Sequence, residues 1–319
     1  MNAKPEVSVV MSVYNGASVL PVTMDSILSQ EGVEFEFIVV NDGSADKSGQ
    51  ILNEYAQRDG RLRIIHQENT GLTRALIHGC NVARGEFIAR QDNGDVSLPG
   101  RLKNQVALLR EHGDCVLVSC WTEFIGPQGE FLYTTRGTGA ASSPINIFSN
   151  ETELGVIDGP TSHPSTMFRT RQYFQCGGYR SEFYYGQDWD LWYRLASLGT
   201  FCTLQKTLCV CRFTLGSVSS SWKHEQTRFG QLSKNAMLMR ERGMSDAPAL
   251  AEARLLSSLK RKVTRHDKSA ANYFIGKCLL ENRNEAAMGY LMSAIKEDPL
   301  HLKAWISLAR CFLPVGKSQ

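Results

Sequence analysis

Several features that would assign a function class at once are missing from this sequence of 319 residues. No apolar run approaches the roughly 20 residues that a membrane-spanning helix needs. The charge is nearly balanced, with 35 Lys and Arg against 32 Asp and Glu, so composition does not point to a nucleic-acid partner. The nine cysteines contain no CxxC pair and cannot all pair within one chain, which favours reduced thiols. We therefore expect a soluble, cytoplasmic protein that binds no nucleic acid, and the polar N-terminus shows no signal peptide.

Familiar catalytic and nucleotide-binding motifs are absent as well. The patterns GxGxxG, GxxxxGK[ST], HExxH and GxSxG do not occur. Their absence argues against dinucleotide-binding dehydrogenases, P-loop ATPases, zincin metalloproteases and α/β-hydrolases.

The N-terminal part of the chain alternates strand and helix signals. Four apolar runs rich in β-branched residues predict strands, and they span 7–13, 34–40, 62–66 and 86–90. Such alternation is typical of an α/β fold, a mostly parallel sheet covered by helices. Ligands bind beyond the carboxyl ends of the strands in these sheets. Three of the predicted strand ends carry polar clusters, at 14–15, 41–44 and 91–95.

The strand signals stop at about residue 222, and the remaining chain predicts helices. We therefore expect an α/β domain over 1–221 and a helical C-terminal region over 222–319. Within that region, 270–313 is similar to about one and a half tetratricopeptide-type hairpins, too few to form a free-standing core. A generic helical cap is an equally good interpretation. Residues 121–160, rich in Gly, Ser and Thr, predict a loop over the site.

Six segments of the sequence, taken in order, resemble the family-2 glycosyltransferases. They are VSVVMSVYNG, FIVVNDGSAD, NTGLTRALIHG, ARGEFIARQDNGDVSLPGRL, HPSTMFR and GGYRSEFYYGQDWDLWYRL, within residues 5–220. The resemblance implies the nucleotide-sugar-binding GT-A fold. It also implies an inverting glycosyltransferase that moves a sugar from a nucleoside diphosphate donor, UDP being the favoured nucleotide, to a hydroxyl of a saccharide or lipid-linked acceptor. The implied role is the synthesis of a surface polysaccharide or glycolipid.

The resemblance implies a catalytic base in the string QDWDLW. Displacement at an anomeric carbon needs a group that takes the proton of the acceptor hydroxyl. Asp188 matches the base of the family, and Asp190 is its rival within the same string. His163, Trp189 and Asp190 are candidate acceptor-side residues, although a structural role is at least as good an interpretation of His163 and an equal one for the other two.

Four residues match the donor side of the family: Tyr14, Asp42, Arg74 and Asp92. Tyr14 would lie against the nucleobase, and Asp42 would accept a hydrogen bond from the base or the ribose. Arg74 would approach the diphosphate or close onto the base. An aspartate in the string NDGS also suits a turn, and a binding role for Arg74 is close to an even choice.

The metal motif departs from the family pattern. Relatives usually show D-x-D, whereas this chain has Asp92, Asn93, Gly94 and Asp95, with Gly94 in place of the second metal carboxylate. Thr214 stands where relatives often have a histidine. A divalent cation, Mg²⁺ or Mn²⁺, needs only one or two protein carboxylates when it also binds a diphosphate. We therefore expect Asp92 and Asp95 to hold such an ion, in a site weakened at two positions.

Two other function classes stay open at this point. A catalytically weak or inactive sugar-nucleotide-binding or scaffold protein, with the helical tail as its working part, would explain Gly94 and Thr214. A nucleotidyltransferase is less favoured, because no GxGTR-like loop follows the first strand.

Residues 223–268 carry 11 Lys and Arg against 5 Asp and Glu. This excess predicts either peripheral contact with the inner face of a membrane or a solvated helix face.

Overall fold

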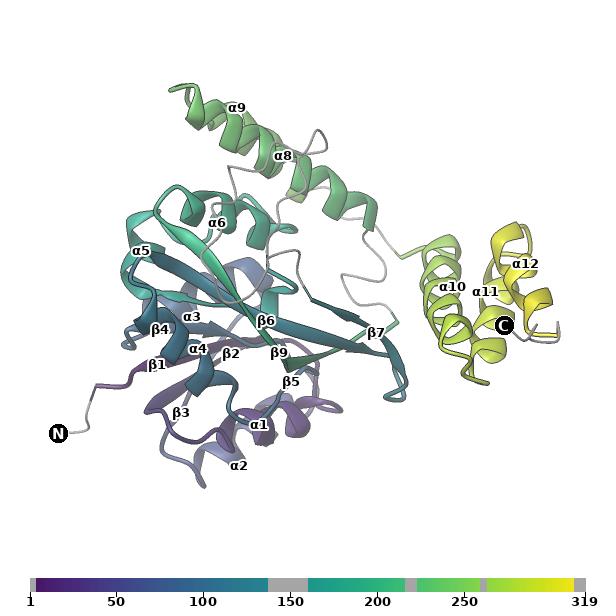
Figure 1. The fold of residues 1–319 in the computed structure, drawn as a ribbon, viewed down its shortest axis with the longest axis horizontal. Coiled ribbons are helices and arrows are strands. Elements are labelled where there is room, and N and C mark those ends of the chain that lie inside the picture. Colours follow the sequence, from purple (N-terminus) through teal and green to yellow (C-terminus); the bar gives the residue numbers. More distant parts are fainter. Residues whose placement is uncertain (1–3, 137–159, 216–222, 259–262, 313–319) are drawn as a thin grey trace. The chain divides into compact units, whose positions relative to one another are not determined.

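The computed structural model describes residues 4–136, 160–215, 223–258 and 263–312. The strands are β1 (Val7–Val13), β2 (Phe35–Asp42), β3 (Leu62–Gln67), β4 (Phe87–Arg90), β5 (Val96–Ser97), β6 (Cys115–Ile125), β7 (Phe131–Thr135), β8 (Met167–Arg169) and β9 (Thr200–Arg212). They form one nine-stranded sheet in the order β3-β2-β1-β4-β8-β6-β9-β5, with β7 paired to β6 (Figure 1). The predicted α/β architecture is therefore confirmed.

The sheet is parallel on one side and mixed on the other. Strands β1 to β4 pair in parallel, as the alternation of strand and helix signals predicts. Strand β8 then pairs antiparallel with both β4 and β6. Because β1 lies between β2 and β4, the winding of the chain reverses there. The carboxyl ends at such a reversal are where open α/β sheets bind ligands.

Helices cover both faces of this sheet. They are α1 (Leu20–Leu28), α2 (Ser48–Ala56), α3 (Leu72–Asn81), α4 (Arg101–Glu111), α5 (Thr170–Gln175) and α6 (Gln187–Ala196), with a 3-10 turn, η1 (His163–Ser165). Alternate residues of β1 point to opposite faces, so Val9 and Met11 belong to the core with α1, α2 and α4, and Val10 to the core with α3, α5 and α6. All three are fully buried, and each such side chain contributes about 1.5–3 kcal/mol. These two cores fix the strand ends that carry the polar clusters.

The chain divides into two compact units. The first comprises 1–122, 135–211 and 227–259, and the second 123–134, 212–226 and 260–319. Helix α8 (Lys223–Glu241), from residue 227 onward, and helix α9 (Ala247–Ser258) thus belong to the first unit. The domain boundary expected at residue 221 stays a prediction.

The second unit contains helices α10 (Arg265–Glu281), α11 (Ala287–Glu297) and α12 (Leu302–Arg310). A capping box starts α10: the Asp267 amide donates to Thr264 Oγ1 at 3.2 Å, and the Thr264 amide donates to Asp267 Oδ2 at 2.8 Å. Gly276 allows α10 and α11 to pack closely, because a Cβ there would lie 2.9 Å from Leu291 Cγ. The likeness to tetratricopeptide hairpins stays a prediction.

The segment expected to form a loop, 121–160, is partly strand. Strand β6 continues to Ile125 and β7 follows it, whereas 137–159 lies outside the described residues.

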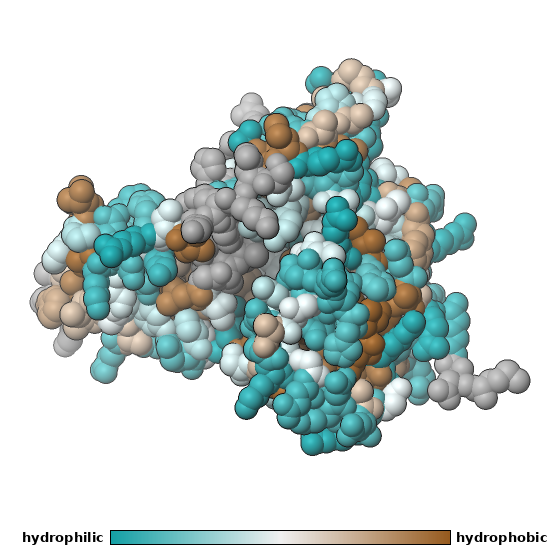
Figure 2. Space-filling view, turned by 180° about the vertical axis from the view of Figure 1, so that it is seen from behind, coloured by the Kyte–Doolittle hydropathy of each residue, from teal (hydrophilic) through white to brown (hydrophobic). Residues whose placement is uncertain are grey.

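Figure 2 shows that the face of the molecule opposite the view of Figure 1 is mostly hydrophilic, with scattered apolar groups. Within the described ranges, none of the helices combines the length and the apolar character needed to cross a membrane.

Candidate functional site

The loops that follow β1 and β2 are tied to each other at the reversal point of the sheet. The Asn15 amide donates to Ser44 Oγ at 3.0 Å, and the Ala45 amide donates to Asn15 Oδ1 at 2.8 Å. Asn15 has a φ of 49°, a left-handed conformation that asparagine tolerates better than most residues. Tyr14 directly precedes it and is 57% exposed. The ring of Tyr14 is therefore available for stacking beside a rigid pair of loops.

Asp42, at the end of β2, is buried and organises the loop that leads into α3. Its Oδ1 accepts hydrogen bonds from Gln67 Nε2 at 2.7 Å and the Thr70 amide at 2.9 Å, and its Oδ2 accepts one from the Gly71 amide at 2.9 Å. A carboxylate can accept about four hydrogen bonds. The structure thus gives Asp42 a loop-holding role and leaves acceptor capacity mainly on Oδ2.

Arg74 lies in the first turn of α3, close in sequence to the bonds around Asp42. Its side chain is exposed. The neighbouring Thr73 is buried, and its Oγ1 donates to the Phe183 carbonyl at 2.7 Å. This bond joins the donor-side helix to the segment that leads into α6. Arg74 is therefore an exposed cation carried by an anchored helix turn.

Asp92 is held by a buried arginine that the sequence analysis did not single out. Arg90 is fully buried at the end of β4, donates to the Val10 carbonyl at 2.7 Å and forms an ion pair with Asp92. The Arg90 Nε also donates to His163 Nε2 at 3.2 Å. His163 Nε2 in turn lies 2.6 Å from the Tyr179 hydroxyl. Asp92 itself keeps 34% of its side chain exposed. A charged residue that ends an otherwise apolar strand, as in EFIAR, is the signal that could have revealed Arg90.

His163 is a structural residue by its geometry. Because an arginine Nε–H only donates, His163 Nε2 accepts from Arg90, and the ring proton lies on Nδ1. Burial, and then the charge of Arg90, hold the pKa of His163 well below its ordinary value. The ring is therefore neutral and supports Arg90. Since His163 Nε2 is already engaged by Arg90 and Tyr179, we favour the structural role over a place at the acceptor.

The expected metal ligands offer one accessible carboxylate. Asp92 is partly exposed, whereas Asp95 is only 7% exposed. No cluster of three or more His, Cys, Asp or Glu side chains that could hold a metal ion occurs among the described residues. The donor set fits a cation that substrate phosphate oxygens also bind, for which one or two carboxylates suffice. Thr214, at the other weakened metal position, belongs to the second unit.

Gly94 could accept a carboxylate only at a cost. Its φ is +98°, and a Cβ there would lie 3.3 Å from Val19 Cγ2. We expect Gly94→Asp to lower the free energy of unfolding by about 1–2 kcal/mol, since L-residues are strained at this φ. Urea unfolding measures this change in the free energy of unfolding. Gly60→Asp is the matched control, because Gly60 has nothing within 4 Å; equal stability of the two variants would contradict the strain at residue 94.

Asp188 begins α6 and has an unusual acidity. The Trp189 amide donates to its Oδ1 at 2.9 Å. The residue is half-buried, and the surrounding protein desolvates its carboxyl, which raises its pKa to about 6. The charges of Asp92 and Arg90 act on it in opposite directions. A carboxylate with a pKa near neutrality is suited to general-base chemistry.

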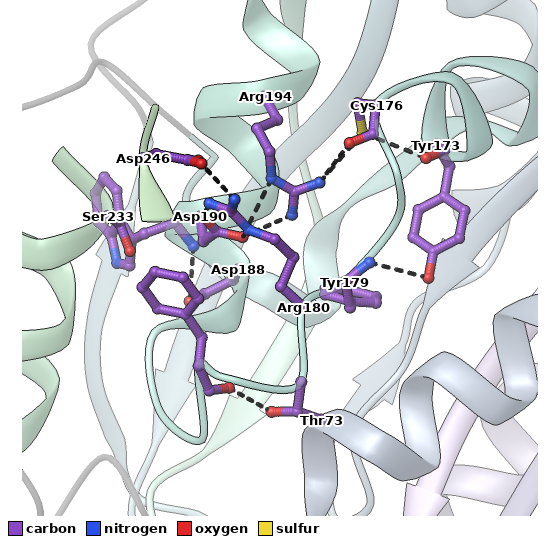
Figure 3. A network of polar contacts seen from close by, with 12 residues as sticks. Thr73, Tyr173, Cys176, Tyr179, Arg180, Asp188, Asp190, Arg194, Ser233 and Asp246 are labelled. Atoms are coloured by element: carbon purple, nitrogen blue, oxygen red, sulfur yellow. Dashed lines mark hydrogen bonds and ion pairs between the residues drawn. The ribbon is translucent and has the colours of Figure 1, made fainter. Parts of the chain in front are cut away.

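Asp190, the rival of Asp188, is locked in ion pairs. It is fully buried, and its carboxylate pairs with Arg180 and, at 2.6 Å, with Arg194 (Figure 3). It therefore cannot meet an acceptor without losing those partners. Trp189 is half-buried and its ring lies 5.2 Å from that of Trp192, so it alone of the expected acceptor-side residues keeps some exposure beside Asp188.

Comparison with known sequences decides the family. The sequence model described as "Glycosyl transferase family 2" matches residues 8–177, more than half of the chain. The chain belongs to glycosyl transferase family 2. EpsE of Bacillus subtilis, which is named as a glycosyltransferase, is 33% identical over 205 residues, covering 62% of this chain and 69% of EpsE. WbnJ of Escherichia coli, an O-antigen biosynthesis glycosyltransferase, is 29% identical over 197 residues, covering 59% of this chain and 71% of WbnJ.

Solved structures share the fold of this family member. The chain resembles S. aureus TarS 1-349 in complex with UDP with a TM-score of 0.59 and 19% identity, covering 96% of this chain and 89% of that one. It resembles the mannosyltransferase PcManGT of Pyrobaculum calidifontis, in complex with GDP-Man and Mn²⁺, with a TM-score of 0.54 and 15% identity, covering 97% and 85%. The predicted GT-A fold is confirmed. The coverage of curated relatives is uneven, since the chain spans only 35% of EpsH from B. subtilis and 64% of MJ1057 from Methanocaldococcus jannaschii.

Proposed function

We propose that this glycosyl transferase family 2 member moves a sugar from a nucleoside diphosphate donor to a hydroxyl acceptor, with inversion and with Asp188 as the general base. The observation that carries the proposal is the half-buried Asp188, placed in the first turn of α6 with its carboxyl oriented by the Trp189 amide and its pKa raised to about 6. An aspartate that serves only a helix N-terminus is stabilised as an anion there. Asp188 shows the opposite shift, which supports a catalytic role.

The reaction is a direct displacement. The acceptor oxygen forms a bond to the anomeric carbon as the bond from that carbon to the diphosphate breaks, and the hydroxyl proton passes to Asp188. The leaving diphosphate gains negative charge, which needs compensation. A divalent cation bound by Asp92 and the phosphates would supply it. Asp95, more deeply buried, stays a secondary ligand in this proposal.

The donor lies at the strand ends in our proposal. Tyr14 stacks on the nucleobase, Asp42 Oδ2 accepts a hydrogen bond from the base or ribose, and Arg74 approaches the diphosphate. The exposure of Tyr14 and Arg74 and the fixed carboxylate of Asp42 support these roles. The relatives bind different nucleotides: TarS was solved with UDP and with UDP-GlcNAc, and PcManGT with GDP-Man. We propose UDP as the nucleotide here.

The acceptor proposal is a saccharide or lipid-linked saccharide in the synthesis of a surface polysaccharide, with Trp189 beside it. The similarity to WbnJ, named for O-antigen biosynthesis, supports this class. Membrane contact through 223–268 and a cytoplasmic location stay predictions. Three of the described cations of that segment, Arg228, Arg240 and Arg254, form ion pairs with acidic residues, and 260–262 lies outside the described residues.

Calorimetric titration with UDP, GDP and TDP, each with Mn²⁺ and with EDTA, tests the donor side. We expect UDP to bind, and to bind more tightly with Mn²⁺. Asp42→Ala should raise the dissociation constant of UDP about tenfold, a loss of about 1.4 kcal/mol. Because Asp42 also holds its loop, Gln67→Ala is the control: it removes the side-chain hydrogen bonds of Gln67 to Asp42, Thr70 and His78, and leaves the carboxylate. Equal affinity losses in both variants would refute the base contact, and no nucleotide binding at all would favour the scaffold hypothesis.

A further inference from the structure

Helices α8 and α9 pack against the segment that leads into the proposed base. The Phe183 and Phe229 rings lie 6.3 Å apart, edge to face, within a buried cluster that also includes Leu232 of α8 and Ala253 of α9. Gly186, the residue before α6, has a φ of +66°, and a Cβ there would lie 3.2 Å from Phe229 Cβ. These helices lie beyond residues 8–177, the part that the family model matches. Helix α6 with Asp188 lies beyond that part as well, and α8 contacts the residue before it.

A series of alternating charges continues this contact (Figure 3). Asp246, just before α9, accepts from Arg180 Nη1 at 2.7 Å and from Arg240 Nη1 of α8 at 2.7 Å. Arg180 turns its other donors to Asp190, with Nε 3.0 Å from Oδ2. Asp190 also pairs with Arg194 one turn further along α6. One continuous chain of ion pairs thus leads from the α8–α9 connection to the first turn of α6, where Asp188 lies.

The ion pairs of this series are largely shielded from solvent. Arg180 is 17% exposed and Asp246 18%, so water screens their pairing only in part. Burial acts to raise the pKa of Asp246, but Arg180 and Arg240 lower it below its ordinary value. Within the described part of the chain, Arg180 pairs with Asp190 of α6 and with Asp246 before α9. The orientation of Arg180 therefore depends on both aspartates together.

The same segment is anchored on its other side. The Phe183 carbonyl accepts from Thr73 of α3, and the Glu182 carbonyl accepts from Ser257 Oγ of α9 at 2.7 Å. Arg254 of α9 pairs with the Glu182 side chain at 2.8 Å. The segment 180–186 is thus held between the donor-side helix and α9. A change in α9 would therefore act directly on the segment that leads into α6.

We infer that Asp246 is a positioning residue for sugar transfer: through Arg180 and Asp190 it fixes the first turn of α6 and with it the Asp188 carboxyl. Asp246 touches no reacting group itself. The inference rests on the proposed role of Asp188. It assigns a positioning function to helices α8 and α9. We call residues 227–258 the brace, because in this inference they hold the base in line with the acceptor hydroxyl. Misplacement of a catalytic group by about 1 Å can cost as much as 100-fold in rate.

Steady-state kinetics of the full chain with Asp246→Asn tests the brace. We expect kcat to fall about tenfold while the KM for the donor sugar nucleotide stays unchanged, because among the described residues the hydrogen bonds and ion pairs of Asp42 and Asp92 involve no residue of the brace. Hydrogen exchange of the amides of 186–191 should become faster, which reports the loosened helix start without any turnover. Asp246→Glu should recover most of kcat, since it restores the charge.

Glu252→Gln is the matched control. It removes a carboxylate from α9 that pairs with Arg228 of α8, and both partners are about half exposed, so kcat and exchange at 186–191 should stay at wild-type values. If Asp246→Asn unfolds, Arg240→Gln provides the second test, because it leaves the Arg180 pair in place and should give a smaller fall in kcat. Unchanged kcat in Asp246→Asn, or equal effects on kcat and KM, would overturn the inference. A wild-type protein that transfers no sugar would instead overturn the proposed function, whatever the exchange rates show.

Discussion

Asp188→Asn is expected to abolish sugar transfer while the protein stays folded and keeps its affinity for the donor nucleotide. General-base catalysis contributes about 10²–10⁴ in rate, so we expect kcat to fall about 10³-fold. Asparagine retains an Oδ1 that can accept the Trp189 amide, the bond that orients the aspartate at 2.9 Å. The variant thus removes the proton acceptor with little change in local geometry.

Transfer from radiolabelled sugar nucleotide and nucleotide titration, run on the same preparation, measure this result. Asp25→Asn is the control, because Asp25 is an exposed carboxylate on α1 whose Oδ1 accepts from the Tyr55 hydroxyl at 2.7 Å. It should transfer sugar at the wild-type rate. Turnover within tenfold of wild type in Asp188→Asn would remove Asp188 as the base.

The pH dependence of kcat follows from the same carboxyl. A base acts only when it is deprotonated, and the pKa of Asp188 is raised to about 6 by burial. We therefore expect kcat to fall about tenfold for each pH unit below about 6, with a single ionisation on the acid side. The groups that act on Asp188 are Asp92, Arg90 and Tyr179.

As the pH rises, the free energy of unfolding should fall while kcat rises. A carboxyl whose pKa is raised in the folded state binds its proton more tightly there than in the unfolded chain, so the folded state loses stability as the pH rises through about 4 to 6. At neutral pH the charged Asp188 costs the fold on the order of 1–2 kcal/mol, allowing for its contact with solvent. Asp188→Asn should therefore be more stable than wild type at pH 7 and equal to it near pH 3. An inactive but more stable variant identifies a residue kept for function.

The sequence predicted the parallel half of the fold well, for local reasons. β1 runs from Val7 to Val13 as its run of β-branched residues predicts, and α1, α2 and α3 lie between β1, β2, β3 and β4 as the alternation of strand and helix signals predicts. The other half depends on pairings between distant segments. Strand β8 has only three residues, Met167–Arg169, yet it lies between β4 and β6. A run that short carries no readable period, and only tertiary contacts decide where it pairs.

The candidate site, like the fold, could be predicted from the sequence only in part. Asp188 and Asp92 were predicted because they occur in motifs with a family resemblance. Asp246 occurs in none of the quoted segments, and it lies 66 positions from its partner Arg180, which is part of the segment GGYRSEFYYGQDWDLWYRL. Charge pairs of that separation leave no trace in one sequence. For His163 the sequence left a binding and a structural role open, because the residue type is the same in a binding site and in a buried support. Its contact with the buried Arg90 favours the structural role.

The second large effect is expected at Asp190, and on stability. Asp190→Asn keeps the shape of the side chain but leaves Arg194, which is 7% exposed, without a counter-charge. Removing one partner of a buried ion pair costs about 3–5 kcal/mol, because the remaining charge stays desolvated. We expect a loss of free energy of unfolding of that size, measured by urea denaturation at pH 7.

Two comparisons make this result specific. Glu252→Gln breaks an exposed ion pair and should cost less than about 1 kcal/mol. The double variant Asp190→Asn with Arg194→Met should be more stable than Asp190→Asn alone, since it removes the uncompensated charge together with its former partner. A cost below about 1 kcal/mol for Asp190→Asn would show that Asp190 is not the buried anchor of α6. Asp190 would then be available to the acceptor, and the roles of the two neighbouring aspartates would have to be exchanged or shared.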